Sequence, residues 1–226
     1  MAVKFKTHDE AGFSLIEVMV ALTILGFVLT GVVAMFVQTG RYHTGQEMTV
    51  EMTQDIRAAK NLMVDEIRSA GCNPDDAARV GFQRDPDDRF DTDANSIHFT
   101  RDIDNGDGDG LYEPDGDVDD ANEDISYYRV DSAGTILDPG DNTTGTLVRN
   151  SGGGGQPVVD NVVDLQFQYY DSANNLIAPA AMNKTSVLDT IRTVEVLITG
   201  QVQNLTRVSA GQETWTQQFR IRVRNL

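Results

Sequence analysis

Apolar residues fill nearly every position from Phe13 to Val37, and a single carboxylate, Glu17, lies close to the start of this run. As a helix with a rise of about 1.5 Å per residue, the segment is roughly 37 Å long, which is enough to cross a bilayer. An ionisable side chain at that depth costs about 3 kcal/mol. We therefore predict a membrane-spanning helix in which Glu17 has a functional role. The alternative is an ordinary anchor whose glutamate reaches the membrane interface.

The apolar pattern becomes periodic after this run. The apolar positions are Met48, Met52, Ile56, Ala59, Met63, Ile67 and Ala70. Their spacing of three and four residues places one apolar stripe on a helix, so the helix is predicted to continue and to pack this stripe on a domain. A bend or a melted turn is expected in the polar stretch that contains Gly40 and Gly45. Gly71 followed by Pro74 predicts the helix end.

The remainder of the chain has the character of β-strands separated by turns. The predicted strand segments are 96–100, 125–130, 163–169, 194–198 and 215–223. The first two flank an acidic stretch, as the arms of a long hairpin would. The glycines at 152–155 predict a flexible connection between strands, because no phosphate-binding pattern accompanies them. The predicted fold is α+β, with one long N-terminal helix packed on an antiparallel β-sheet head domain.

The chain is strongly acidic. It has 18 Lys and Arg residues against 35 Asp and Glu residues, a net charge of −17. Such a surface repels nucleic acid, so we expect no nucleic-acid partner recruited through net charge, and it favours divalent cations or basic partners. Residues 102–124 alone hold eleven carboxylates and no Lys or Arg. Crowding like charges in one loop disfavours compact structure unless something neutralises them.

The spacing of oxygen ligands in this acidic loop predicts calcium as the neutralising ion. Alternate side chains can face one centre, and a glycine permits the sharp turn between them. The candidate ligands are Asn105, Asp107, Asp109 and Glu113, with Asp102, Asp104, Asp115 and Asp117 completing the coordination or forming a second site. The match to an EF-hand is incomplete, because a loop starting at Asn105 ends at Gly116 without the terminal glutamate. A solvated acidic loop is the alternative.

Residues typical of catalysis are not arranged in any known catalytic motif. The sequence has no HExxH, GxSxG, CxxC or Walker pattern, so we predict that the protein is not an enzyme. Its one cysteine excludes an internal disulfide. Arg220, Arg222 and Arg224 share one face of the last predicted strand. They form either a solvated face or a contact with an acidic surface of a neighbouring subunit.

The start of the apolar run carries a specific motif. Residues 12–17, GFSLIE, resemble the processing motif of type IV pilins and type II secretion pseudopilins. The resemblance implies that a prepilin peptidase cuts between Gly12 and Phe13 and methylates the new N-terminal amine of Phe13. It also implies that Glu17 neutralises this amine on an adjacent subunit when the helices assemble into a filament.

Together these features divide the chain into four parts. They are a leader peptide at 1–12, a transmembrane and filament-core helix at 13–37, its amphipathic continuation at 38–72, and a β-rich head at 73–226. The resemblance implies a single pass through the inner membrane with a periplasmic head before assembly, and a place in an extracellular pilus afterwards. The implied partners are the prepilin peptidase, the inner-membrane assembly platform and other minor and major pilins.

The order of elements along the head resembles the PilW-like minor pilins. A long helix is followed by a strand, an aspartate-rich loop and the strand EDISYY, and the last strand is followed by RNL. The resemblance implies a low-copy subunit that primes or caps pilus assembly with other minor pilins. Two alternatives stay open: a type II secretion pseudopilin of the J type, and an adhesin or binding module at a pilus tip.

Overall fold

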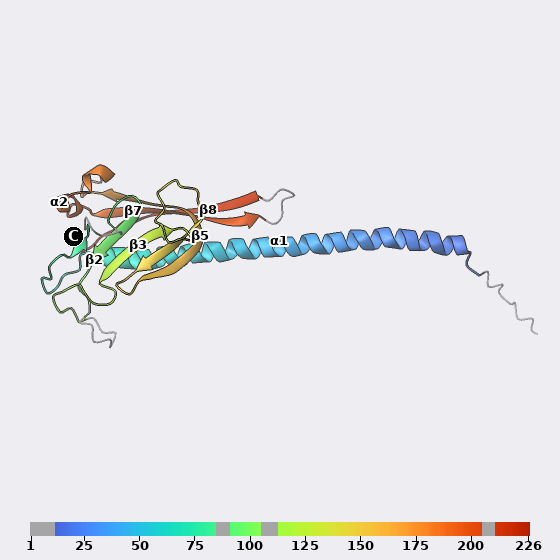
Figure 1. The fold of residues 1–226 in the computed structure, drawn as a ribbon, viewed down its shortest axis with the longest axis horizontal. Helices are drawn as coiled ribbons and strands as arrows, with labels where there is room; N and C mark the ends of the chain where they lie inside the picture. The colour runs from blue at the N-terminus through green and yellow to red at the C-terminus, as the bar shows by residue number, and fades with distance from the viewer. Residues whose placement is uncertain (1–11, 85–90, 105–112, 205–210) are drawn as a thin grey trace, which may run out of the picture.

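A computed structural model describes residues 12–84, 91–104, 113–204 and 211–226. Its main feature is the helix α1, Leu15–Ser69, which has 55 residues and is about 80 Å long. The N-terminal half of α1 extends away from the head, and the C-terminal half packs against a β-sheet (Figure 1). This arrangement confirms the predicted α+β fold with a long N-terminal helix on an antiparallel sheet.

The helix is continuous through Gly40 and Gly45, where the sequence predicted a bend or a melted turn. An isolated glycine costs only about 1 kcal/mol in a helix interior, and helix propagation is cooperative, so the flanking turns carry the helix through. The predicted end is confirmed: α1 stops at Ser69, and Gly71 has a φ of 77°, a left-handed conformation that favours glycine.

The head is one antiparallel sheet of eight strands in the order β1-β2-β3-β4-β5-β7-β8, with β6 paired to β5 outside this path. The strands are β1 (Gly81–Phe82), β2 (Ser96–Thr100), β3 (Asp124–Val130), β4 (Gly145–Asn150), β5 (Gly155–Tyr170), β6 (Leu176–Ile177), β7 (Thr193–Asn204) and β8 (Gly211–Arg222). A 3₁₀ helix (Pro179–Ala181) and the short α2 (Thr185–Leu188) lie between β6 and β7. The predicted pairing of β2 with β3 is confirmed, whereas β1, β4 and β6 were not predicted.

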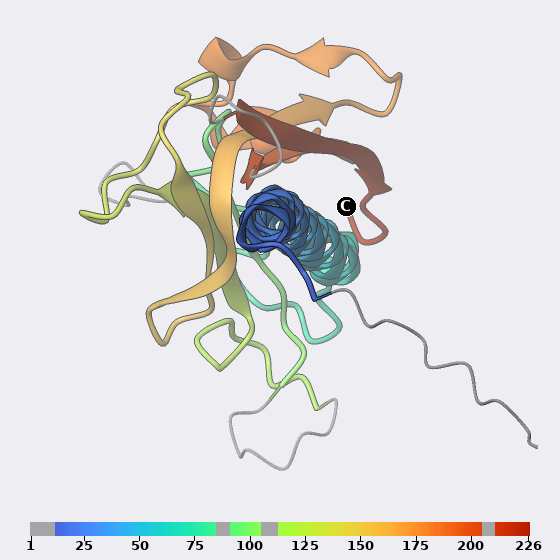
Figure 2. The ribbon, with the colours of Figure 1, turned by 90° about the vertical axis from the view of Figure 1, so that its right-hand side faces the viewer.

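Strand β5 joins the two halves of the sheet. Its first part pairs with β4 and its second part pairs with β7, and the two pairings meet at Val162. Asn161, next to this point, has a φ of 58°, and both ladders shift register close by. These irregularities bend the strand, and a view along α1 shows the sheet curving around the helix (Figure 2).

The apolar stripe of α1 fills the concave side of the sheet. Met52, Ile56, Ala59, Met63, Ile67 and Ala70 are buried in the core, as predicted. Met48, predicted to belong to the stripe, is 37% exposed because it lies at the edge of the head. On β7, a Cβ at Gly200 would collide with Met52 and lie 2.9 Å from Cδ1 of Ile56. Glycine therefore lets α1 approach the strand directly.

A buried ion network also fixes α1 to the sheet. Glu66 on α1 accepts hydrogen bonds from Nη2 of Arg149 on β4 at 2.7 Å and from its Nε at 3.0 Å. The hydroxyl of Tyr127 on β3 donates to the same carboxylate, and Nη2 of Arg101 lies 4.0 Å away. Burial lowers the pKa of Arg149, but the bonds to Glu66 outweigh that effect and raise it. Glu66 is thus a second, polar attachment of the helix.

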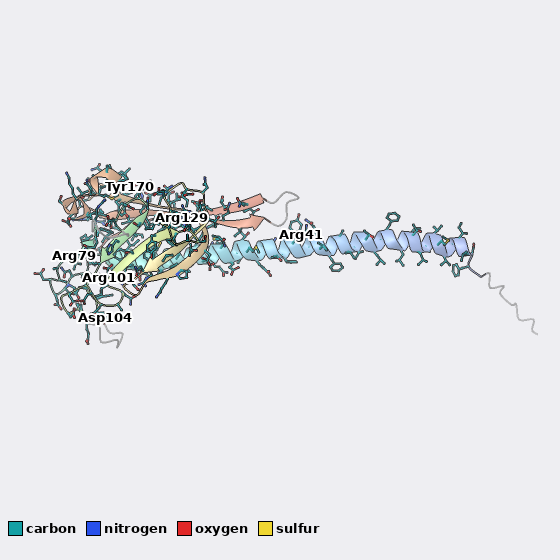
Figure 3. All side chains as sticks on the ribbon, viewed as in Figure 1. Arg41, Arg79, Arg101, Asp104, Arg129 and Tyr170 are labelled. Carbon is teal, nitrogen blue, oxygen red and sulfur yellow. The ribbon has the colours of Figure 1, made fainter. Side chains whose placement is uncertain are left out.

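A second buried cation, Arg129 on β3, is held by carbonyl groups. It donates from Nη1 and Nη2 to the main-chain oxygens of Asp138, Asp141, Thr143 and Val163 at 2.6–3.0 Å. Its desolvation lowers the pKa of the guanidinium. Arg129 therefore fastens the loop between β3 and β4 to the bend of β5 (Figure 3).

Candidate functional site

The processing motif, residues 12–17, spans the start of α1. Ser14 is the N-cap residue in an extended conformation, and its carbonyl accepts hydrogen bonds from the amides of Glu17 at 3.0 Å and Val18 at 3.2 Å. Glu17 therefore sits in the first turn, where the positive end of the helix dipole favours a carboxylate. Phe13 and Glu17 line the same shallow pocket of about 310 Å³, together with Val18, Ala21, Leu22 and Leu25.

The surface around Glu17 is apolar and uncovered. Every residue from 12 to 44 is exposed, and the apolar side chains project on all sides of the helix (Figure 3). Phe13 is 83% exposed and Phe27 is 77% exposed. Within residues 12–84, 91–104, 113–204 and 211–226, the carboxylate of Glu17 has no ion pair or hydrogen bond. A surface of this kind requires a membrane or other protein chains around it.

The same segment satisfies the requirements of a membrane span. Among the described residues, α1 is the one helix that is long and apolar enough to cross a membrane by length and composition. Its most apolar window of 18 residues has a mean hydropathy of 2.5, and none of that window is buried in the protein. The predicted membrane segment at 13–37 thus coincides with the free half of α1.

The acidic loop is the second predicted site, and two buried carboxylates organise the part of it that the structure describes. Asp102 accepts hydrogen bonds from the amides of Asp115 and Gly116, both at 3.2 Å. Glu123 accepts from the amides of Ile103 at 2.6 Å and Asp104 at 2.9 Å. Burial raises the pKa of Glu123, although these amides partly counteract it. Asp102 and Glu123 therefore hold the two ends of the loop together.

Three carboxylates of this loop converge. Ligand oxygens of Asp115, Asp117 and Asp120 lie within 4.8 Å of one another. Ca²⁺ takes oxygen ligands at about 2.4 Å, so oxygens up to about 4.8 Å apart can share one ion. Burial and the neighbouring charges of Asp115 and Asp117 raise the pKa of Asp120, which shows that the carboxylates repel one another. This donor set fits a divalent cation.

The structure brings together only some of the predicted ligands. Asp115 and Asp117 meet, and they are joined by Asp120, which the sequence pattern did not single out. Glu113 is exposed and Asp104 is half-buried. The ligands predicted at Asn105, Asp107 and Asp109 lie outside the described residues. Calcium binding by residues 102–124 therefore stays a prediction.

We expect calcium to raise the melting temperature of the head by about 5 °C or more when it is present at about 100 times its Kd, because it binds the folded loop alone. The measurement is thermal unfolding of the full chain in detergent, with calcium and with chelator. Replacing Asp117 and Asp120 with asparagine should abolish the difference, whereas Asp65→Asn, at an exposed site on α1, should preserve it. Identical melting curves with and without calcium would contradict the prediction.

Comparison with known proteins addresses the N-terminal segment. A protein-family model described as a prokaryotic N-terminal methylation motif matches residues 7–33, which include Gly12, Phe13 and Glu17. No curated protein in the comparison matches the chain. The motif indicates a structural protein that is processed by a prepilin peptidase, anchored in a membrane and assembled with other pilins. The motif, at the start of a long helix that packs on an antiparallel sheet, indicates a type IV pilin-like or pseudopilin-like protein.

Proposed function

We propose that the chain is a minor pilin, a low-copy subunit that primes or caps a type IV pilus together with other minor pilins. The observation that carries the proposal is the position of the processing motif. Cleavage after Gly12 creates a free amine on Phe13, four residues before Glu17 and at the start of a helix whose apolar surface is uncovered. Cleavage thus places a positive group on the same helix end as the carboxylate of Glu17.

These two groups provide a driving force for assembly. In the membrane the carboxylate of Glu17 lies in an apolar environment, which is costly without a partner. In a filament, the amine of Phe13 on an adjacent subunit supplies that partner. An ion pair in a low-dielectric core is favourable when its geometry is good, and breaking it leaves a charge uncompensated. The subunit is therefore more stable in the filament than alone in the membrane.

The shape of the protein supports a filament subunit. The free half of α1 offers apolar side chains on all sides, so it can be surrounded by the same segments of other subunits. Within the described residues the head packs against the C-terminal half of α1, which leaves it at the periphery of such a bundle (Figure 1). Contacts between unlike faces that do not close into a ring generate helical filaments.

Assignment to minor pilins rests on the element order of the head, which resembles the PilW-like proteins. The same processing motif and helix would also serve a type II secretion pseudopilin of the J type. The two are separated by the location of the mature protein: a minor pilin is recovered with pili sheared from the cell surface. A pseudopilin stays with the cell envelope and is required for protein secretion.

The test compares the wild-type protein with Gly12→Asp in cells that contain an active prepilin peptidase. It measures removal of the leader and recovery of the protein in sheared pili. We expect the wild-type protein to lack residues 1–12, to carry one methyl group on Phe13, and to occur in sheared pili. The variant should keep its leader, remain in the membrane, and be absent from pili. Gly153→Asp is the matched control, because Gly153 lies in a loop with open space around it. An intact leader on wild-type protein would overturn the proposal.

A further inference from the structure

Four arginines line one pocket at the end of the head that is farthest from the free half of α1. They come from three separate segments: Arg68 from the end of α1, Arg192 from the residue before β7, and Arg222 and Arg224 from the end of β8 and just beyond it. The pocket has a volume of about 810 Å³. We call it the arginine pocket.

Main-chain hydrogen bonds fix the three segments against one another. The amide of Arg224 donates to the carbonyl of Arg68 at 3.2 Å, and the amide of Val223 donates to the carbonyl of Arg192 at 3.0 Å. The side chain of Leu226 packs against the core and fills the space above Gly71. The pocket is thus part of the framework of the head.

The arginines of this pocket are not neutralised within the described part of the chain. The side chains of Arg68, Arg222 and Arg224 have no ion pair or hydrogen bond there, and Arg192 donates only to the carbonyls of Asp189 and Ile191. Arg220, two residues before Arg222, differs: its Nε lies 2.6 Å from Glu195, and its guanidinium lies 4.5 Å from the ring centre of Tyr170. Arg220, Arg222 and Arg224 share one exposed face, as expected, because they alternate with the buried Phe219, Ile221 and Val223. Arg220 is already paired with Glu195.

Negative groups in the arginine pocket do not balance its charge. Asp171 contributes the one side-chain carboxylate among the lining residues, and it accepts hydrogen bonds from the amides of Ala173 at 2.9 Å and Asn175 at 2.8 Å. Its bonds to Asn175 lower the pKa of this carboxylate. Among the side chains that line the pocket, four positive charges therefore face one negative charge. In a chain of net charge −17, this is a concentrated positive site.

The chemistry of the arginine pocket selects its ligand. A guanidinium binds a carboxylate through two parallel hydrogen bonds, and several arginines around one space suit a ligand with several carboxylates. We propose that the arginine pocket docks acidic side chains of the adjacent pilin-like subunit on the membrane-distal side of the head. This inference rests on the proposed function, because it requires a neighbouring subunit in a filament.

The opposite end of the head carries an acidic surface of this kind. Glu51, Asp55 and Asp160 line a pocket of about 580 Å³ where α1 leaves the sheet. Asp55 and Arg68 are thirteen residues apart on α1, which is about 20 Å along the helix. One subunit therefore presents carboxylates on its membrane-proximal side and arginines on its distal side. An adjacent pilin-like subunit that presents carboxylates on its own membrane-proximal side would bring opposite charges together at the arginine pocket, in a contact that does not close on itself.

The first test measures binding of a fluorescent oligo-aspartate peptide to the full chain in detergent micelles. We expect binding that weakens with salt and that drops at least about tenfold in Arg222→Gln/Arg224→Gln, which loses two charge-assisted contacts. Arg41→Gln/Arg57→Gln, with two exposed arginines on α1, should bind like the wild type. Absence of binding, or an equal loss in both variants, would overturn the proposal. So would tighter binding of an oligonucleotide of equal charge through the same arginines, since that result assigns the pocket to phosphates.

A second measurement in cells separates this inference from the proposed function. Arg222→Glu/Arg224→Glu should be cleaved and methylated like the wild type, with an unchanged melting temperature, but its recovery in sheared pili should fall at least about tenfold. Normal recovery of a correctly processed variant in sheared pili would overturn the proposed docking at the arginine pocket and would leave the proposed pilin function intact. A wild-type protein that keeps its leader would instead overturn the proposed pilin function, whether or not the oligo-aspartate peptide binds.

Discussion

Glu17→Ala will be inserted in the membrane and lose its leader like the wild type, but its recovery in sheared pili will fall roughly a hundredfold. Removing one member of a buried ion pair costs about 3 kcal/mol or more, which corresponds to about two orders of magnitude in an equilibrium constant. The substitution also stabilises the membrane-bound subunit, because it removes a carboxylate that is unfavourable there. Both effects shift the assembly equilibrium away from the filament.

The measurement is the ratio of pilus-associated to membrane-associated protein, quantified by immunoblot at matched expression. Glu47→Ala provides the control, because Glu47 is an exposed acid on the same helix beyond the predicted membrane segment. Glu17→Gln should behave like Glu17→Ala, since it keeps the size of the side chain but not its charge. Incorporation of either Glu17 variant at the wild-type level would show that Glu17 is an ordinary anchor residue.

Glu66→Ala will lower the free energy of unfolding of the head by about 3–5 kcal/mol. The substitution leaves the guanidinium of Arg149 and the hydroxyl of Tyr127 buried without the carboxylate that they share. For a domain of this size the loss corresponds to a decrease of roughly 10 °C in the melting temperature. The effect is large because this carboxylate ties the helix to two strands at once.

Fluorescence of Trp215, the single tryptophan and a residue of β8, can report unfolding of the sheet in the full chain. Asp65→Ala is the matched control, because Asp65 is the exposed neighbour of Glu66 on the same helix. The double variant Glu66→Leu/Arg149→Met should be less destabilised than the sum of its single substitutions, since residues in direct contact couple. A change below about 1 kcal/mol in Glu66→Ala would contradict a stabilising role for this ion network.

The helix and most of the strands could be predicted because their signals are local. A spacing of three and four residues specifies one face of a helix wherever that helix packs, so Met52, Ile56 and Met63 were placed correctly in the core. Local patterns likewise predicted the second part of β5, at 163–169, and the first part of β7, at 194–198. Strand β4 was missed because its sequence, GTLVRN, is short and has no clear alternation between apolar and polar residues.

The polar contacts could not be predicted, because they join residues far apart in the sequence. Glu66 and Arg149 are 83 positions apart, and nothing near Glu66 marks it as buried while its neighbour Asp65 is exposed. The acidic loop shows the same limit. Composition identified residues 102–124, but the main-chain amides that Asp102 and Glu123 hold decide which carboxylates converge. Asp120 joined the cluster for that reason.

The long hairpin of β7 and β8 runs beside α1 toward the free half of this helix (Figure 1). Its twelve paired positions extend from Thr193 opposite Arg222 to Asn204 opposite Gly211. Hydrogen bonds between antiparallel strands are perpendicular to the strands. A force that slides β7 along β8 therefore loads these bonds in shear, so that many of them resist at once.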